Sequence, residues 1–237
     1  MSEISDYYDK ESSVYSEKRY FGAPQTYVKF YFKNRMKIVL ELLSKILKNE
    51  KNLALLDVAC ADGVITEAID RTFPNVFSRL VGTDISPLMV STAQNKFAKD
   101  SRFSFFVKDL CPVEQYDVAL GLGYISASIF NEEMNFLKIR LKTGGYYVCT
   151  LASPNSIYAK LKLSHETYIK DYRSYDEYRK MLSPHFHIID EVSSGIFIPK
   201  LWAFPRLARV IQPMAEILFR NILPNLFHEK IYLLRKK

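Results

Sequence analysis

Short apolar segments alternate with helical patterns between Leu53 and Leu151, and this alternation constrains the fold more than any other feature of the sequence. It is typical of βα units, in which crossover helices connect the parallel strands of one sheet. Apolar residues at helical spacing predict crossover helices within 66–71 and 87–99. The predicted strands lie at 54–59, 78–83, 103–107, 116–121 and 145–151. We therefore expect an α/β fold with a doubly wound, mostly parallel sheet and helices on both faces.

The flanking segments complete this predicted sheet. Residues 27–47 carry apolar side chains on a helical period, which predicts a leading helix packed on the sheet. Residues 164–182 are polar and rich in tyrosine, and we expect one helical segment there. Apolar runs at 185–192 and 230–234 predict a sixth and a seventh strand. The expected sheet therefore has seven strands.

A helical insertion is predicted at 201–227, before the last strand. Pro205, Pro213 and Pro224 are expected to divide it into short pieces. Its apolar and polar residues fall on opposite predicted faces. The apolar face comprises Trp202, Phe204, Leu207, Ile211, Met214 and Leu218, and the polar face comprises Arg206, Arg209, Gln212, Glu216 and Arg220. Such a stripe favours a cap over a substrate pocket or a homodimer contact.

Positive charge is concentrated near the C-terminal end. The formal net charge is +7, and positions 200–237 hold eight basic residues against two acidic ones, a net of +6. The rest of the chain therefore carries only +1. A basic, apolar segment of this kind is suited to an anionic membrane surface, and we consider peripheral contact through residues 201–237.

No stretch of the sequence predicts export, a membrane span or a metal site. The first thirty residues lack the apolar core of a signal peptide, and no later segment reaches about eighteen uninterrupted apolar residues. Cys60, Cys111 and Cys149 lie far apart without metal-ligand spacing, so we interpret them as buried thiols in a reducing compartment. We expect a cytoplasmic protein that can lie peripherally at the inner membrane surface.

A strand that ends in a turn of small residues and then opens a helix runs from Leu55 to Thr66. Small residues let a backbone approach a ligand closely, and the following helix offers free N–H groups to an anionic part of that ligand. A dinucleotide-binding turn would need its third glycine where this sequence has Val64. The spacing therefore disfavours a nicotinamide dinucleotide.

This turn resembles the first motif of class I S-adenosylmethionine-dependent methyltransferases, an acidic residue followed by three alternating glycines. The resemblance implies that Asp57 lies near the cofactor ammonium. It also implies that Ala59, Cys60, Ala61 and Gly63 line the turn around the methionine part of S-adenosyl-L-methionine. Alanine replaces two of the three glycines, and we expect this to be tolerable where φ stays negative.

Further matches to this family lie at successive strand ends, where open α/β sheets bind ligands. Asp84 follows the second strand, and the resemblance implies that it accepts hydrogen bonds from the ribose hydroxyls. Asp109 follows the third strand and resembles the acid that contacts the adenine amino group. The remaining residues predicted to contact the cofactor here are Ile85, Lys108, Leu110 and Gly121. For a single aspartate, a helix cap or turn residue is the alternative interpretation.

The tyrosine-rich N-terminus is similar to the lid of small-molecule, quinone and sugar methyltransferases, which implies contacts from Tyr15 and Arg19 to the cofactor. The alternative is simple packing on the first helix. Methyl transfer to a hydroxyl benefits from a general base, and the catalytic candidates are His165 and Tyr124, with Glu166 and Asp171 nearby. An exposed helix residue is the alternative interpretation for His165.

The sequence predicts one domain, 1–237, with a lid and leading helix at 1–50, a cofactor-binding core at 53–151 and a substrate side at 152–237. The expected activity is methyl transfer to a hydroxyl or amine of a small-molecule or lipid-linked acceptor, such as a sugar or quinone. An RNA methyltransferase is one alternative, although no added RNA-binding module is found. A non-catalytic binding protein with the same fold is another.

Overall fold

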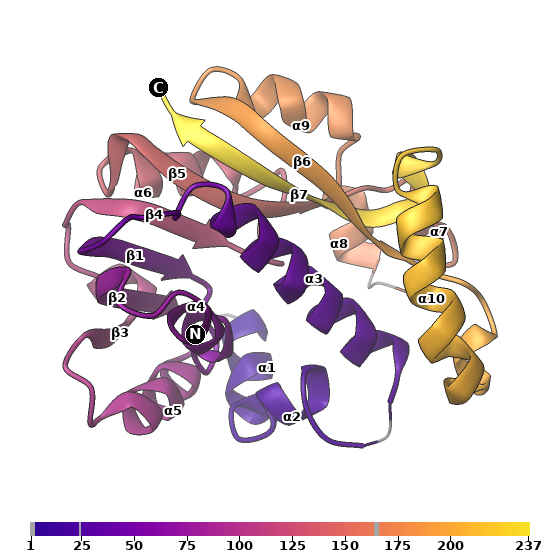
Figure 1. Cartoon of the computed structure of the whole chain (residues 1–237), viewed down its shortest axis with the longest axis horizontal. Helices are drawn as coiled ribbons and strands as arrows, with labels where there is room; N and C mark the ends of the chain where they lie inside the picture. Colours follow the sequence, from indigo (N-terminus) through magenta and orange to yellow (C-terminus); the bar gives the residue numbers. More distant parts are fainter. Residues whose placement is uncertain (1–2, 24, 164–165) are drawn as a thin grey trace.

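The computed structural model describes residues 3–23, 25–163 and 166–237. Its centre is a seven-stranded sheet in the order β3-β2-β1-β4-β5-β7-β6 (Figure 1). The strands are β1 Leu53–Val58, β2 Phe77–Asp84, β3 Phe103–Val107, β4 Tyr116–Gly121, β5 Leu141–Ala152, β6 Phe186–Ile196 and β7 Phe227–Lys236. The prediction of a seven-stranded, mostly parallel sheet is confirmed.

The path of the chain through the sheet positions the site. β1 pairs in parallel with both β2 and β4, so the strand order reverses between β1 and β4. β7 is antiparallel to both β5 and β6. In open α/β sheets, ligands bind beyond the carboxyl ends of the strands at such a reversal point. For this chain that place is the edge where β1, β2 and β4 end.

Helices cover both faces of the sheet. The described helices are α1 Glu3–Glu11, α2 Tyr15–Arg19, α3 Tyr27–Ser44, α4 Val64–Thr72, α5 Pro87–Phe97, α6 Phe130–Lys138, α7 Ile157–Lys160, α8 Glu166–Asp171, α9 Tyr175–Leu182 and α10 Pro205–Phe219. Apolar side chains of α3 and α4 form one core cluster with β1 and β7, whereas α6 and α9 pack on the opposite face. The leading helix predicted at 27–47 is α3, capped by the Thr26 hydroxyl.

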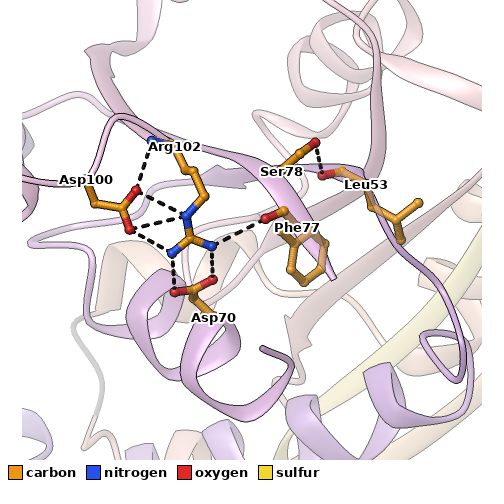
Figure 2. Close-up of polar contacts among 6 residues, drawn as sticks. All are labelled: Leu53, Asp70, Phe77, Ser78, Asp100 and Arg102. Atoms are coloured by element: carbon orange, nitrogen blue, oxygen red, sulfur yellow. Dashed lines mark hydrogen bonds and ion pairs between the residues drawn. The ribbon is translucent and has the colours of Figure 1, made fainter. Parts of the chain in front are cut away.

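Ion pairs fix the sheet edge opposite the carboxyl ends (Figure 2). Arg102, just before β3, donates to both carboxylate oxygens of Asp70 on α4 at 2.8 and 3.0 Å. It also contacts Asp100 and the carbonyl of Phe77 at the start of β2. Because these charged side chains are partly exposed, their ion pairs contribute little to the stability of the fold. Their main effect is on how the connected elements are oriented. It holds α4 and the starts of β2 and β3 in one register.

Two predictions about the C-terminal third are wrong. The segment 164–182 is not one helix, because the chain breaks after α8 and Ser174 starts α9 with a capping box to Glu177. The insertion is not divided at Pro213, because α10 runs through that residue. Proline removes one helical hydrogen bond, and the contacts of Gln212 and Glu216 described below hold the helix across that gap.

The two predicted faces of α10 differ in exposure. Gln212 and Glu216, predicted on the polar face, are 0% and 1% exposed. Leu207 and Met214, predicted on the apolar face, are 51% and 56% exposed. The physical reason is that both polar side chains find backbone partners on β6, as detailed below. Ile211 and Leu218 are exposed as well.

None of the helices in the described ranges combines the length and the hydropathy needed to cross a membrane.

Candidate functional site

The turn between β1 and α4 has an alternating left-handed backbone. The φ angles of Ala59, Ala61 and Gly63 are +60°, +50° and +77°. The condition under which alanine would be tolerated without strain, a negative φ, is therefore not met: both alanines take the conformation that glycine would adopt freely. A non-glycine residue costs about 1 to 2 kcal/mol in this region, and such strain concentrates at functional sites. The turn thus keeps a glycine-type backbone despite its alanines.

Asp57 lies buried at the end of β1, directly beneath this turn. Its carboxylate accepts a hydrogen bond of 2.6 Å from the hydroxyl of Thr66 on α4. Burial raises the pKa of Asp57 to about 7, the Asp84 charge adds to that rise, and the Thr66 hydrogen bond opposes it. A cation placed against this carboxylate would restore its charged form.

Asp84 connects the turn with the start of α5. One carboxylate oxygen accepts the backbone N–H of Ala61 at 2.9 Å, and the other accepts the N–H of Ser86 at 3.0 Å. Burial raises the pKa of Asp84, while these backbone hydrogen bonds lower it. A carboxylate has about four acceptor positions. Backbone N–H groups of Ser86, Ala61 and Ile85 use part of this capacity, and the rest stays available for a hydroxyl group of a ligand.

Exposed apolar side chains flank the ends of β2 and β3. These strands are neighbours, with Asp84 opposite Val107. Ile85 is 42% exposed and Leu110 is 72% exposed, while Asp109 is exposed between the two strand ends. Two apolar groups beside a carboxylate can hold a flat ring that carries an amino group. Lys108 points elsewhere, since its ammonium pairs with Glu132 at 2.8 Å.

The N-terminal helices lie against these strand ends, where a lid would have to lie (Figure 1). The carboxylate of Asp9 on α1 accepts hydrogen bonds from the Ser86 hydroxyl and from the N–H of Leu88, at the start of α5. The Ser16 hydroxyl on α2 donates to Asp62 in the β1–α4 turn. Sequence reasoning missed Asp9 and Asp62. Asp62 was readable as part of the turn, whereas nothing in the sequence pointed to Asp9.

Tyr15 and Arg19, both predicted to contact the cofactor, lie on α2. The Arg19 guanidinium stacks 4.2 Å from the centre of the Tyr15 ring and pairs with Glu11 at 2.6 Å. Tyr15 packs against the core cluster of α3, and burial raises its pKa. The pair therefore braces the lid, and Arg19 also lines the cavity described next.

A cavity of about 460 Å³ opens between the lid, α3 and the end of β4. Its aromatic lining residues are Tyr7, Tyr27, Tyr31, Phe32 and Tyr158. Arg35 lies at its base, where Nε and Nη2 pair with the Glu229 carboxylate at 2.8 and 2.9 Å. A Cβ at Gly123 would come within 2.6 Å of that guanidinium, so the cavity reaches the backbone just after β4.

His228 lines the same cavity from β7. Its ring centre lies 5.0 Å from that of Tyr158 and 5.5 Å from that of Tyr31. Burial lowers the pKa of His228 to about 4, with the Glu229 charge opposing. Among the described residues, its buried Nδ1 has no hydrogen-bond partner. The ring is therefore neutral at pH 7. His228 was not among the catalytic residues predicted from the sequence.

Neither Tyr124 nor Asp171 lines this cavity. Tyr124 packs against the core cluster of α6, and its buried hydroxyl lies among Glu133 and Tyr147, so burial raises its pKa. Asp171 accepts hydrogen bonds from the Ser128 N–H at 3.0 Å and hydroxyl at 2.7 Å, which holds the loop after β4. His165 lies outside the described residues, as does the side chain of Glu166.

Two further predicted site residues, Cys60 and Gly121, lie just after β1 and at the end of β4. Cys60 is buried against α5 in a small cluster with Val90 and Phe105. Gly121 ends β4, and a Cβ there would meet the hydroxyl of Tyr147 at 2.2 Å. The residues at the ends of β1, β2 and β4 are therefore close together.

Comparisons with known proteins agree with this geometry. Residues 55–138 match the sequence model of a family described as methyltransferase domain. A malonyl-[acyl-carrier protein] O-methyltransferase of Ilyobacter polytropus is 34% identical over 73 residues, which are 30% of this chain and 26% of that protein. The matched segment thus spans about a quarter of this curated relative.

Two solved structures share the fold over nearly their whole length. The magnesium protoporphyrin IX methyltransferase of Synechocystis with bound S-adenosylhomocysteine is 14% identical, with a TM-score of 0.67 over 99% of this chain and 98% of that one. The geranyl diphosphate C-methyltransferase of Streptomyces coelicolor is also 14% identical, with a TM-score of 0.65 over 99% and 97%. These two likenesses show the fold of this chain, and residues 55–138 carry its sequence similarity to methyltransferase domains.

Proposed function

We propose that this protein transfers a methyl group from S-adenosyl-L-methionine to a hydroxyl or amine of a small-molecule or lipid-linked acceptor. The observation that carries the proposal is the left-handed turn of Ala59, Ala61 and Gly63, with Asp84 bound to its backbone. A chain that only needed a connection between β1 and α4 would have no reason to keep strained alanines there.

The cofactor fits the residues at this edge. Asp57 offers a buried carboxylate for the ammonium group, and Asp84 keeps acceptor capacity for a ribose hydroxyl. Ile85 and Leu110 supply exposed apolar surface for the adenine, with Asp109 beside them for its amino group. S-adenosylhomocysteine or S-adenosylmethionine bound to proteins of the same fold supports this choice of cofactor.

The acceptor would bind in the aromatic cavity under the lid. The bound cofactor supplies an electrophilic methyl group, so the protein's work is to align the acceptor and exclude water. Tyr27, Tyr31 and Tyr158 offer flat apolar surface, and Gly123 brings the cavity to the end of β4. The names of the structural neighbours, which methylate a porphyrin and geranyl diphosphate, favour a small acceptor.

His228 is the side chain best placed to accept the acceptor proton. It is neutral at pH 7, borders the cavity and has an unused ring nitrogen. General bases must first lie within reach of the acceptor and only then have a suitable pKa. Tyr124 and His165 stay predictions, with the hydroxyl of Tyr124 directed toward the core cluster of α6.

The test is calorimetric titration of the purified protein with S-adenosylhomocysteine. We expect binding by the wild type and a loss of at least tenfold in affinity for Asp84→Asn, which keeps the side-chain shape. Asp176→Asn, at a side chain 84% exposed on α9, is the matched control and should bind normally. If the wild type binds neither S-adenosylhomocysteine nor S-adenosylmethionine, the proposal fails and a non-catalytic role is favoured. Binding together with methylation of RNA rather than small acceptors would reassign the substrate.

A further inference from the structure

The side of α10 that faces the sheet carries two buried polar residues among alanines. The two polar residues fix how the helix is turned. Glu216 accepts the backbone N–H groups of Gly195 and Ile196 at 3.1 and 2.9 Å. Gln212 donates to the carbonyl of Ile196 at 2.6 Å. Buried polar groups that lack partners cost more than hydrogen-bonded ones. If α10 were rotated about its axis, these side chains and the backbone groups of β6 would lose their hydrogen-bond partners. The hydrogen bonds therefore specify the orientation of α10.

The outer side of α10 and of the segment after it is consequently apolar. In the described part of the chain nothing covers these side chains; Val210, Ile217 and Ile222 are 60%, 71% and 70% exposed. The other exposed apolar residues of this surface are Phe204, Leu207, Ile211, Met214, Leu218, Phe219 and Leu223. We call this set the α10 surface. An apolar surface of this extent marks an interaction site.

The charges around the α10 surface have one sign. Residues 197–227 contain four basic side chains and a single acidic one, Glu216. That acid is buried beneath the helix, whereas Lys200, Arg206 and Arg209 are exposed. The outward field of the α10 surface is therefore positive.

We propose that the α10 surface docks on an anionic phospholipid bilayer. An interfacial helix presents apolar side chains to the acyl boundary and basic side chains to anionic headgroups, which is the combination found here. A second copy of this chain is a poorer fit, because a twofold contact would bring the exposed arginines of one copy toward those of the other. α10 stands at one end of the molecule, away from β3 and α5, so a flat surface can reach it (Figure 1).

Docking would also orient the acceptor cavity. Trp202, just before α10, lies with its ring centre 5.8 Å from that of Phe30 and 6.5 Å from that of Tyr27. Tyr27 lines the cavity. A bilayer that contacts α10 would thus lie on the side of the molecule where Tyr27 forms the cavity wall. This arrangement suits an acceptor whose lipid tail stays in the bilayer. This last step rests on the proposed function, whereas the docking itself does not.

The first experiment is co-sedimentation of the full chain with phosphatidylcholine vesicles that contain about one third phosphatidylglycerol, at low salt. The test variant combines Val210→Ser, Ile217→Ser and Ile222→Ser. The matched control combines Ile139→Ser and Ile189→Ser, which are 48% and 51% exposed elsewhere. We expect the wild type and the control to bind, and the test variant to lose at least tenfold in partition coefficient.

A second pair of variants tests the charges. A basic side chain near an anionic surface contributes about 1 kcal/mol, or roughly fivefold in partitioning. Arg206→Gln combined with Arg209→Gln should therefore bind about 30-fold more weakly, and neutral vesicles should bind neither form well. Lys37→Gln with Arg71→Gln, at side chains 73% and 79% exposed, is the control and should bind like the wild type.

Several results would overturn the docking proposal. The first is failure of the wild type to bind anionic vesicles. The second is equal binding by the test and control variants. The third is a wild type that binds no vesicles but forms a concentration-dependent dimer, which the apolar test variant abolishes. All variants should bind S-adenosylhomocysteine like the wild type, because none alters the cofactor edge. If the wild type binds anionic vesicles but does not bind the cofactor, the proposed function is refuted and the docking proposal stands.

Discussion

Cofactor affinity should depend on pH through Asp57. The carboxyl is buried, and its pKa is raised to about 7 when no cation lies against it. A bound ammonium group requires the ionised form, so binding must be coupled to loss of a proton. Because the pKa of this acid is raised, the competent form is lost as the pH falls through 7. Affinity should therefore rise with pH.

The size of the effect follows from this pKa. The fraction of ionised Asp57 predicts that S-adenosylhomocysteine binds about eightfold more weakly at pH 6.0 than at pH 7.5, or about 1.2 kcal/mol. At pH 6.5, binding should release about 0.75 proton per molecule. Titration calorimetry in two buffers that differ in ionisation enthalpy measures both quantities.

The variant Asp57→Asn distinguishes the effect of Asp57 on the pH dependence from that of its neighbour Asp84, whose pKa is also raised by burial. The variant can still accept the Thr66 hydroxyl through its amide oxygen, so the turn should persist. We expect weaker binding at pH 7.5 and a flat pH profile. A wild-type affinity independent of pH, or a pH dependence that survives in Asp57→Asn, would refute the reasoning.

Three further outcomes follow from the buried contacts. Replacing Ala59 or Ala61 by glycine should raise the free energy of unfolding by about 0.5 to 1 kcal/mol in urea titrations. Glycine relieves the left-handed strain, and its greater entropy in the unfolded chain offsets only part of that gain. Lower stability would contradict the assigned turn. Glu229→Gln removes the partner of the buried Arg35 guanidinium and should cost about 3 to 5 kcal/mol by the same assay, with a cost below 1 kcal/mol arguing against the pair. Burial raises the pKa of Glu216 to about 7, so this acid becomes ionised as the pH rises from 6 to 8. The free energy of unfolding of the wild type should therefore fall by about 1 kcal/mol over this range, whereas that of Glu216→Gln should not. Identical pH profiles of the two proteins would show that Glu216 does not titrate in this range.

The strands and the cofactor edge were predictable because each depends on local sequence. Apolar runs marked β1 to β4 within a residue or two. Asp57 and Asp84 were predicted as site residues from the resemblance of their strand ends to methyltransferase motifs, and parallel strands bring those ends to one edge whatever the details of packing. The capping box that begins with Ser174 was also readable, and it would have divided 164–182 correctly.

What could not be predicted depends on contacts between distant segments. Periodicity places Gln212 and Glu216 on the same helical face as the arginines of α10, but it cannot show that Glu216 accepts a backbone N–H of β6 or that Gln212 donates to a carbonyl there. His228 gained its environment from α3 and α7, which lie far from it in sequence. The conformation of Ala61 likewise follows from its hydrogen bond to Asp84 rather than from its own preference.

The contacts of the lid set a kinetic condition on turnover. Asp9 is bonded to the start of α5 and Ser16 to the β1–α4 turn, so under the proposed function we expect these contacts to open before the cofactor reaches this edge. Association should then be slower than diffusion allows, and it should saturate at the opening rate when ligand is plentiful. The same opening must precede departure of the spent cofactor, which would make product release rather than methyl transfer the slow step of each cycle.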